Sequence, residues 1–204
     1  NKHMVKNNAI LNSANNQMQM FNMPAVNFFD IKKETRNTLN ERCEKAFDLV
    51  SKHDTSVYWV NLNDEAKLLK SLDSSSFEIK GSMSIDQKEE MLIGFAKGDI
   101  KKLITKTKIT AFGLNWQHCN HTTYFPTYSY EQYYQAIRRF WRFGQKNNVT
   151  VDLVLSDGQT RIMDSLSVKK TKANDMFTKL SQNVNSIYEI QKREFTKEII
   201  KPKF

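Results

Sequence analysis

Cysteine, proline and glycine are scarce in this sequence, which contains 2, 3 and 6 of them in 204 residues. The two cysteines, Cys43 and Cys119, lie far apart and neither belongs to a CxxC pair, which argues against a disulfide framework and against a zinc ribbon. No run of about 18 apolar residues occurs, and the first residues lack the apolar core of a secretory signal. We therefore expect a cytoplasmic protein with no membrane partner.

Acidic residues are the minority charge. The 31 lysines and arginines outnumber the 22 aspartates and glutamates, which leaves a formal net charge of +9. Five lysines and one acid, Asp99, lie between Lys97 and Lys108, and a second basic group follows at residues 138–146. Such an excess favours a polyanionic partner through phosphate contacts and counterion release. A solvated basic surface would explain the total charge equally well, so the positions of the clusters carry more information.

The composition is that of a globular protein. The hydrophobic fraction of 39% and the aromatic fraction of 11% predict one folded domain with a core. Residues 1–24 are rich in Asn, Gln and Met without a helical period, and we interpret them as a lead-in segment, either mobile or left from cloning. We assign residues 25–160 to the folded domain and residues 161–204 to a C-terminal helical extension.

Strand-like and helix-like segments alternate along the folded domain. The β-branched and aromatic runs predict strands at residues 56–62, 77–80, 101–106, 121–125 and 150–155. Apolar residues at helical spacing, with capping residues before two of the segments, predict helices at residues 34–53, from 63 to about 72, 84–97 and 129–144. This alternation predicts an α/β fold in three layers, with a mainly parallel sheet flanked by helices.

Ligands of an open parallel sheet gather outside the carboxyl ends of its strands. After the strand at 77–80 comes the small-residue turn at 81–84, whose following helix N-terminus suits a phosphate, although a plain connecting turn is the commoner explanation. The loop at 107–116 follows the next strand with hydroxyls, a lysine and a glycine. We consider it the better site for a nucleic-acid backbone, and Trp116 at its end is a candidate nucleic-acid contact, with packing in the core as the alternative.

The predicted helix at 129–144 carries a line of polar residues. Gln135, Arg139 and Arg142 recur at positions i, i+4 and i+7, which would place all three on one face opposite an apolar stripe. Two guanidinium groups in adjacent turns repel each other unless an anion lies between them. The pattern therefore favours a phosphate ligand, with a solvated basic face as the alternative.

Four segments resemble the motifs of one protein family. QAIRRFWRFGQ, residues 135–145, resembles the sixth motif of superfamily 2 helicases and is closest to the Swi/Snf-type branch. TKTKITAFGLNW (105–116) resembles the fifth motif, residues 78–105 the segment before it, and SVYWVNLNDEAKLL (56–69) the fourth. The amino-acid sequences of these segments resemble those of phage and prophage DNA helicases. The resemblance spans about residues 34–160 and implies a second, RecA-like motor lobe of the P-loop-NTPase type.

The resemblance also implies roles for individual residues. It gives the catalytic arginines that reach ATP phosphates as Arg139 and Arg142. It gives the cofactor-binding positions as Gly113, Asn115, Gln135 and Gln145. It gives the nucleic-acid contacts as Ser82, Thr107 and Lys108, to which we add Trp116. Thr110 and Ala111 stand where that branch usually has two glycines, and Arg138 replaces a common acidic residue, so the loop geometry is expected to differ from the family pattern.

The sequence contains no GxxxxGK[ST] loop and no Asp-Glu box at a strand end. We therefore expect this fragment to be inactive alone and to bind neither ATP nor Mg²⁺ by itself. In the intact protein, an N-terminal lobe would hold both, and the implied activity is ATP-dependent helicase or translocase action on DNA. RNA remains an alternative substrate, and a phage-encoded protein would work in the bacterial host cytoplasm.

Two other function classes are open on the sequence alone. A non-catalytic nucleic-acid-binding module would keep the same fold and basic loops without an ATPase lobe. A stand-alone α/β enzyme is disfavoured because no nucleophile and base, and no paired carboxylates, stand at the predicted strand ends. His118, Cys119 and His121 lack a second ligand pair at zinc spacing, so we expect no metal site.

Overall fold

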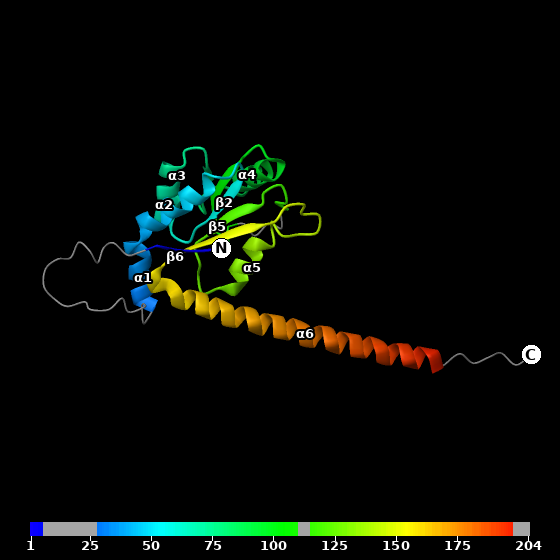
Figure 1. Cartoon of the computed structure of the whole chain (residues 1–204). Helices are drawn as coiled ribbons and strands as arrows, with labels where there is room; N and C mark the ends of the chain where they lie inside the picture. Colours follow the sequence, from blue (N-terminus) through cyan, green and yellow to red (C-terminus); the bar gives the residue numbers. More distant parts are fainter. Residues whose placement is uncertain (6–27, 110–114, 198–204) are drawn as a thin grey trace, which may run out of the picture. The chain divides into compact units, whose positions relative to one another are not determined.

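The computed structural model describes residues 1–5, 28–109 and 115–197. Its centre is a six-stranded sheet with the order β1-β6-β5-β2-β4-β3, and every neighbouring pair is parallel (Figure 1). The strands are β1 Lys2–Val5, β2 Ser56–Trp59, β3 Phe77–Glu78, β4 Lys102–Thr105, β5 His121–Tyr124 and β6 Thr150–Ser156. The helices are α1 Phe28–Asn37, α2 Leu39–Val50, α3 Asn63–Leu72, α4 Ile85–Lys97, α5 Tyr130–Ile137 and α6 Thr160–Lys197, with a short 3-10 turn, η2, at Asp157–Gln159.

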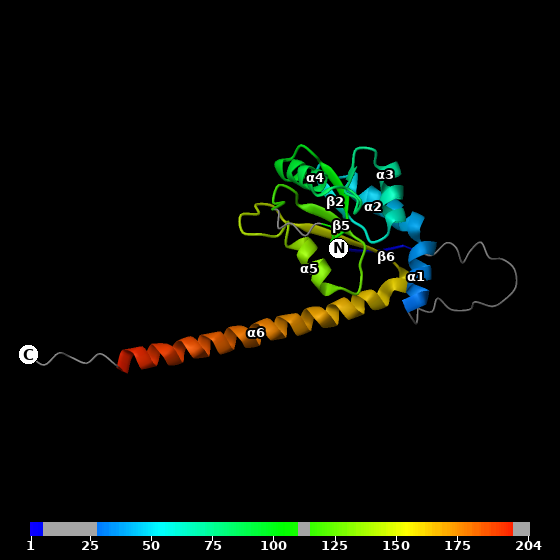
Figure 2. The ribbon, with the colours of Figure 1, turned by 180° about the vertical axis from the view of Figure 1, so that it is seen from behind.

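Helices cover both faces of the sheet. Successive residues of a strand point to opposite faces, so Val57 and Trp59 join one core cluster while Tyr58 and Val60 join the other. The first cluster packs against α4 and α5, and the second packs against α2 and α3, which lie side by side in both views (Figure 2). The predicted three-layer α/β fold with a parallel sheet is therefore confirmed.

Helix α4 begins and ends where its sequence predicts. Ser84 Oγ accepts a hydrogen bond from the Gln87 backbone N–H, and the Gln87 side-chain oxygen accepts one from the Ser84 N–H, both at 3.2 Å. These bonds satisfy amide groups that have no partner inside the helix. Gly98 ends the helix with a φ of 88°, a left-handed conformation that side chains other than glycine rarely adopt.

The predicted helix at 34–53 is in fact two helices. The chain leaves helical geometry at Thr38, whose φ is -104°. Arg42 is buried just beyond the break, and its guanidinium donates to the Thr35 carbonyl at 2.6 Å and to Thr38 Oγ1 at 3.2 Å. The helical spacing of apolar residues could not reveal this break. The break is held by hydrogen bonds from Arg42 to polar groups, and these play no part in the apolar pattern.

The predicted lead-in segment also contains regular structure. Residues 2–5 form β1, coloured dark blue in Figure 1, which pairs with β6 through four residue pairs from Lys2 with Leu153 to Val5 with Ser156. The interpretation of residues 1–24 as mobile is therefore wrong for this strand. Residues 6–27 lie outside the described residues.

The chain divides into two compact units, residues 1–164 and 165–204. The first unit contains the sheet and the cavity described in the next subsection. Both cysteines, Cys43 and Cys119, are buried in it. In the second, the described side chains up to residue 182 are mostly exposed along α6. No helix in the described part of the chain has the length and apolar character needed to cross a membrane.

Candidate functional site

A cavity of about 760 Å³ opens at the carboxyl ends of the central strands. The residues that follow β2, β4 and β5 form much of its wall, and α1 forms another part, with single residues added by α2, α5, β6, η2 and α6. Its floor is apolar and consists of the buried side chains Val60, Phe125, Val154 and Ile162. The cavity therefore lies at the edge of the sheet where parallel topology places ligands.

The charges around the cavity all have one sign. Five cationic side chains line it, and no aspartate or glutamate is among the lining residues that the structure describes; the five are Lys32, Arg36, Arg42, Lys106 and Lys108. Arg42 is neutralised by Glu65, whose carboxylate oxygen lies 2.7 Å from the arginine nitrogen with both groups buried. The other four place cationic groups on two sides of the rim, which suits an anionic ligand.

The loops at this edge are held by hydrogen bonds. Glu65 Oε2 accepts from the backbone N–H groups of Asn61 and Leu62, at 2.8 and 2.9 Å, and so fixes the turn after β2. Lys106 Nζ donates to Asn63 Oδ1 at 2.7 Å, which joins the loop after β4 to the start of α3. Thr107 Oγ1 donates to Gln132 Oε1 on α5 at 3.3 Å. The candidate backbone contacts Thr107 and Lys108 thus stand on a fixed part of the rim.

The arginine line predicted on the helix at 129–144 does not form. Helix α5 ends at Ile137, and Arg139 is only 8% exposed, with its guanidinium 5.2 Å from the Trp116 ring centroid. The backbone N–H of Trp116 also donates to the Arg139 backbone carbonyl at 3.0 Å. Burying Phe140 and Arg139 against Trp116 competes with helix continuation, and this tertiary packing prevails. Burial, followed by repulsion from Arg142, lowers the pKa of Arg139.

Arg142 lies in the turn after α5, and its side chain is exposed. Its Nε donates to the Arg138 carbonyl at 3.0 Å. The turn is fixed to the loop after β4, because Gln145 Nε2 donates to the Gln117 carbonyl at 3.0 Å and Gln117 Nε2 donates to the Phe143 carbonyl. Arg142 is therefore the candidate arginine that the structure presents at the surface on a braced turn.

The remaining predicted site residues are dispersed. Gln135 is exposed on α5, and its side-chain amide donates a hydrogen bond to Glu131 at 3.0 Å. Asn115 is also exposed, and its side-chain amide donates a hydrogen bond to the side-chain oxygen of Gln117. Ser82 is exposed in the turn after β3, away from the residues that line the cavity. The side-chain amide of Gln145 donates hydrogen bonds to backbone carbonyls, including that of Gln117. Gly113 lies outside the described residues.

Trp116 does not fit the role that we predicted for it. Its side chain is fully buried and stacks on Trp59, with ring centroids 5.7 Å apart. A buried indole offers no face to a nucleobase, so the assignment of Trp116 as a nucleic-acid contact is wrong. The loop position suggested exposure, but the apolar ring has joined the core.

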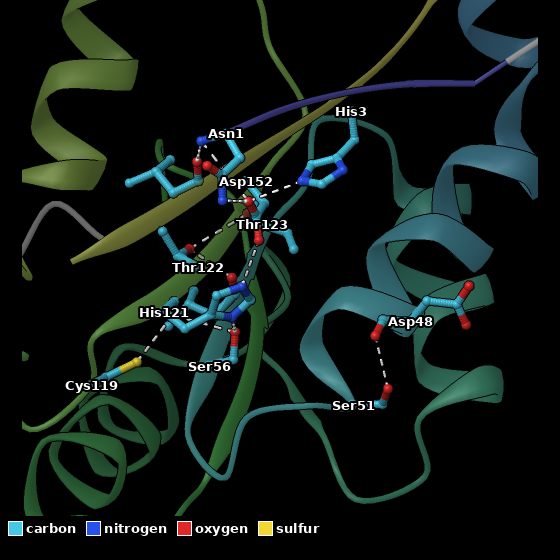
Figure 3. Close-up of polar contacts among 12 residues, drawn as sticks. Asn1, His3, Asp48, Ser51, Ser56, Cys119, His121, Thr122, Thr123 and Asp152 are labelled. Atoms are coloured by element: carbon cyan, nitrogen blue, oxygen red, sulfur yellow. Dashed lines mark hydrogen bonds and ion pairs between the residues drawn. The ribbon is translucent and has the colours of Figure 1, made fainter. Parts of the chain in front are cut away.

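Sequence reasoning missed a buried polar chain at the opposite edge of the sheet. Ser56 Oγ lies 2.7 Å from His121 Nδ1, and His121 Nε2 lies 2.9 Å from Asp152 Oδ2 (Figure 3). His3 Nε2 reaches the other oxygen of Asp152 at 3.0 Å. The order of groups is that of a hydrolase triad. However, Ser56 and His121 are 0% exposed and Asp152 is 3% exposed, so no substrate can reach the serine.

The polar chain is therefore structural, and its protonation follows from its contacts. Burial lowers the pKa of His121, although hydrogen bonding to Asp152 opposes that shift. The neutral imidazole carries its proton on Nε2, toward the carboxylate, and Nδ1 accepts from Ser56. Burial alone would raise the pKa of Asp152, but hydrogen bonds led by the one from His121 lower it to about 2. His3 joins this chain and so ties β1 to β6.

Among the described residues, no group of three or more His, Cys, Asp or Glu side chains is arranged to hold a metal ion. His118 in particular packs its ring against Phe95, with centroids 4.9 Å apart.

Comparison with known proteins identifies the fold family. Residues 35–144 match the family described as "Helicase conserved C-terminal domain", which is more than half of the chain. The chain belongs to this family. The helicase C-terminal domain is the second RecA-like lobe of superfamily 2 helicases, and its match ends at Gly144, one residue before the end of the segment that resembles the sixth motif.

Relatives of this helicase C-terminal domain are larger proteins. It is 29% identical over 106 residues to the "Bifunctional helicase and thymine dioxygenase JBP2" of Leishmania tarentolae, which covers 51% of this chain and 10% of the relative. The C-terminal part of the Fun30 ATPase domain has a TM-score of 0.53 at 16% identity, covering 64% of this chain and 45% of that one. Dbp5 of S. cerevisiae, solved bound to Gle1 and IP6, has a TM-score of 0.56 at 17% identity, covering 64% and 36%. The two structures support the fold.

Proposed function

We propose that this helicase C-terminal domain is the second motor lobe of an ATP-dependent DNA helicase or translocase of the Swi/Snf type. The observation that carries the proposal is the cavity at the carboxyl ends of β2, β4 and β5, whose rim is basic and free of lining carboxylates among the described residues. Lysine and arginine at such an edge bind phosphates of a nucleic-acid backbone without reading sequence. The likeness of the motifs to phage helicases, and a host-cytoplasm location, remain predictions.

In the proposed protein, ATP and Mg²⁺ bind to a partner lobe that contains the phosphate loop. The exposed guanidinium of Arg142, on its braced turn, fits the role of a group that meets the triphosphate across the cleft between lobes. Closing and opening of the cleft would then move the strand gripped by Thr107 and Lys108. In this arrangement Arg139 has a structural role, because its guanidinium packs on the Trp116 ring.

The test is the salt dependence of DNA binding by the 204-residue chain. Replacing Lys106 and Lys108 by Gln should weaken binding and make the plot of log affinity against log salt less steep, by about 0.7–0.9 for each phosphate that the protein no longer neutralises. The matched control replaces Lys52 and Lys170, which are exposed and do not line the cavity. Binding that is independent of salt, or equally weakened by the control, would contradict the proposal.

A further inference from the structure

We infer that helix α1 is a second phosphate-binding wall, which grips the nucleic-acid backbone from the side opposite the loop after β4. This inference rests on the proposed function. It concerns Lys32 and Arg36, which line the cavity together with Lys106 and Lys108. None of the helicase-like motifs includes α1, and Lys32 lies before the first residue of the family match.

The position of α1 is fixed by hydrogen bonds to the turn after β6 and to α2. Thr35 Oγ1 accepts from Gln159 Nε2 at 2.6 Å, and Gln159 Oε1 accepts from the Ser156 N–H at 3.0 Å. Gln159 is 4% exposed and Ser156 ends β6, so the helix is joined directly to the sheet. On its other side, Arg42 Nη2 donates to the Thr35 carbonyl at 2.6 Å.

A close approach between helix and turn adds to this attachment. The Glu34 side chain of α1 packs directly over Gly158 in the turn after β6, where an added Cβ atom would lie 2.8 Å from Glu34 Cδ. The bonds to Thr35 and the contact at Gly158 hold the middle of the helix. Lys32 and Arg36 flank that held part, and α1 is thus a built wall of the cavity.

The spacing of the two cations favours an anion between the walls. Lys32 and Arg36 are one helical turn apart, where like charges destabilise a helix by a small amount. Lys106 and Lys108 add positive charge from a different element of the same cavity. A phosphodiester backbone would meet cationic groups at both walls.

The rim, and not the apolar side chains beneath it, is the part of the cavity that a nucleic-acid strand can reach. Phe125 and Val60 are both 3% exposed, so they belong to the core and offer no face to a nucleobase. Cations on the rim contact phosphates without reading the sequence. The two walls are therefore expected to contact different phosphates of one backbone.

The experiment compares three double variants of the 204-residue chain: Lys32→Gln with Arg36→Gln, Lys106→Gln with Lys108→Gln, and the control Lys52→Gln with Lys170→Gln. Binding of a short oligo(dT), of a duplex of equal length and of ATP alone is measured against salt concentration, and the melting temperature of each variant is recorded. We expect the α1 variant to lower the steepness of the oligo(dT) salt plot by about 1.4, for two phosphate contacts, with melting unchanged. The control should keep the wild-type slope.

The outcomes separate the inference from the proposed function. If the α1 variant matches the control while the Lys106 and Lys108 variant has a shallower slope, the second wall is refuted and the proposed function stands. If the wild-type protein shows no salt dependence for either nucleic acid, both fail. If ATP alone binds the wild-type protein, and the α1 variant weakens this binding but not the binding of either nucleic acid, the cavity is a mononucleotide site and the inference is refuted.

A photo-crosslinking group at position 36, with position 52 as the control, gives a readout that does not depend on affinity. Crosslinks to oligo(dT) or to duplex from position 36 only are expected, and their yield tells which of the two enters the cavity. Equal yields from both positions would refute the second wall.

Discussion

Arg139 and Arg142 lie three residues apart but occupy different surroundings. Arg139 is buried against the ring of Trp116, whereas Arg142 is exposed on a turn fixed by Gln117 and Gln145. An arginine can act on a bound phosphate only where the phosphate can reach it. The two side chains should therefore respond differently to substitution, one in catalysis and the other mainly in stability.

For Arg142, replacement by Ala in the intact two-lobe protein should leave the melting temperature within the small range of surface substitutions. The ATP turnover stimulated by DNA should fall about a thousandfold, because a positioned arginine stabilises charge on the transferring phosphoryl group. Replacement by Lys should not restore the rate, since the ammonium lacks the planar fork. Lys170→Ala is the silent control. Near-normal turnover in folded Arg142→Ala would remove this residue from the mechanism.

For Arg139, replacement by Ala should lower the free energy of unfolding by about 1–3 kcal/mol, because the change removes packing against Trp116. Denaturant unfolding of the 204-residue chain measures this directly. Arg138→Ala is the matched control, since that side chain is exposed. An Arg139 variant as stable as the control would show that its packing contributes nothing.

The acid response of the chain is a third expectation at the residue scale. Burial lowers the folded-state pKa of His121, so the unfolded state takes up the proton first and stability falls as pH drops below 6.5. The lowered pKa of Asp152 acts in a second window, in which stability is full above 3.8 and is lost toward about 2. Both effects have the same sign, so acid destabilises the fold twice.

Unfolding free energies measured at several pH values test this expectation. His121→Gln should flatten the upper window and also reduce the fall below 3.8, because it removes the imidazole whose hydrogen bond contributes most to lowering the pKa of Asp152. His118, whose pKa burial also lowers, contributes to the same upper window, and His118→Gln measures its share. An upper window that survives both substitutions would assign the proton uptake to other groups.

Among the elements, the sequence predicted those that depend on regular periods and on local caps. The alternation of strands and helices, the parallel sheet and the capping box of α4 all follow from residues near one another in the chain. The end of α5 depends instead on contacts of Arg139 and Phe140 with Trp116, which is distant in sequence. The predicted helix was extended beyond Ile137, where α5 ends, and this extension produced the predicted line of arginines, which the structure does not contain.

The cavity was predictable only in part. Thr107 and Lys108 follow a strand directly, so their place at the carboxyl edge of the sheet could be inferred. The basic pair on α1 could not, because nothing local places that helix beside the end of β6. The spacing of Lys32 and Arg36 was visible in the sequence, but it becomes informative only once Gln159 joins Thr35 to the sheet.

At the scale of the whole molecule, the chain spans a tenth of JBP2 and 45% of the Fun30 structure that it matches. Because its sequence has no phosphate loop, we expect the 204-residue chain to show no ATP hydrolysis stimulated by nucleic acid. A phosphate-release assay with and without DNA measures this. Turnover that persists through further purification and is abolished by Arg142→Ala would show that the lobe needs no partner.

The burial of both thiols has a practical consequence. Burial raises the pKa of Cys43 to about 12 and that of Cys119 to about 11, so neither forms much of the thiolate that reacts with maleimides. A cysteine introduced at the exposed Asn115, close to the turn that carries Arg142, would be the one that takes up a fluorophore. The native protein is thus ready for fluorescence measurement of how this turn approaches a partner lobe, without removal of its own cysteines.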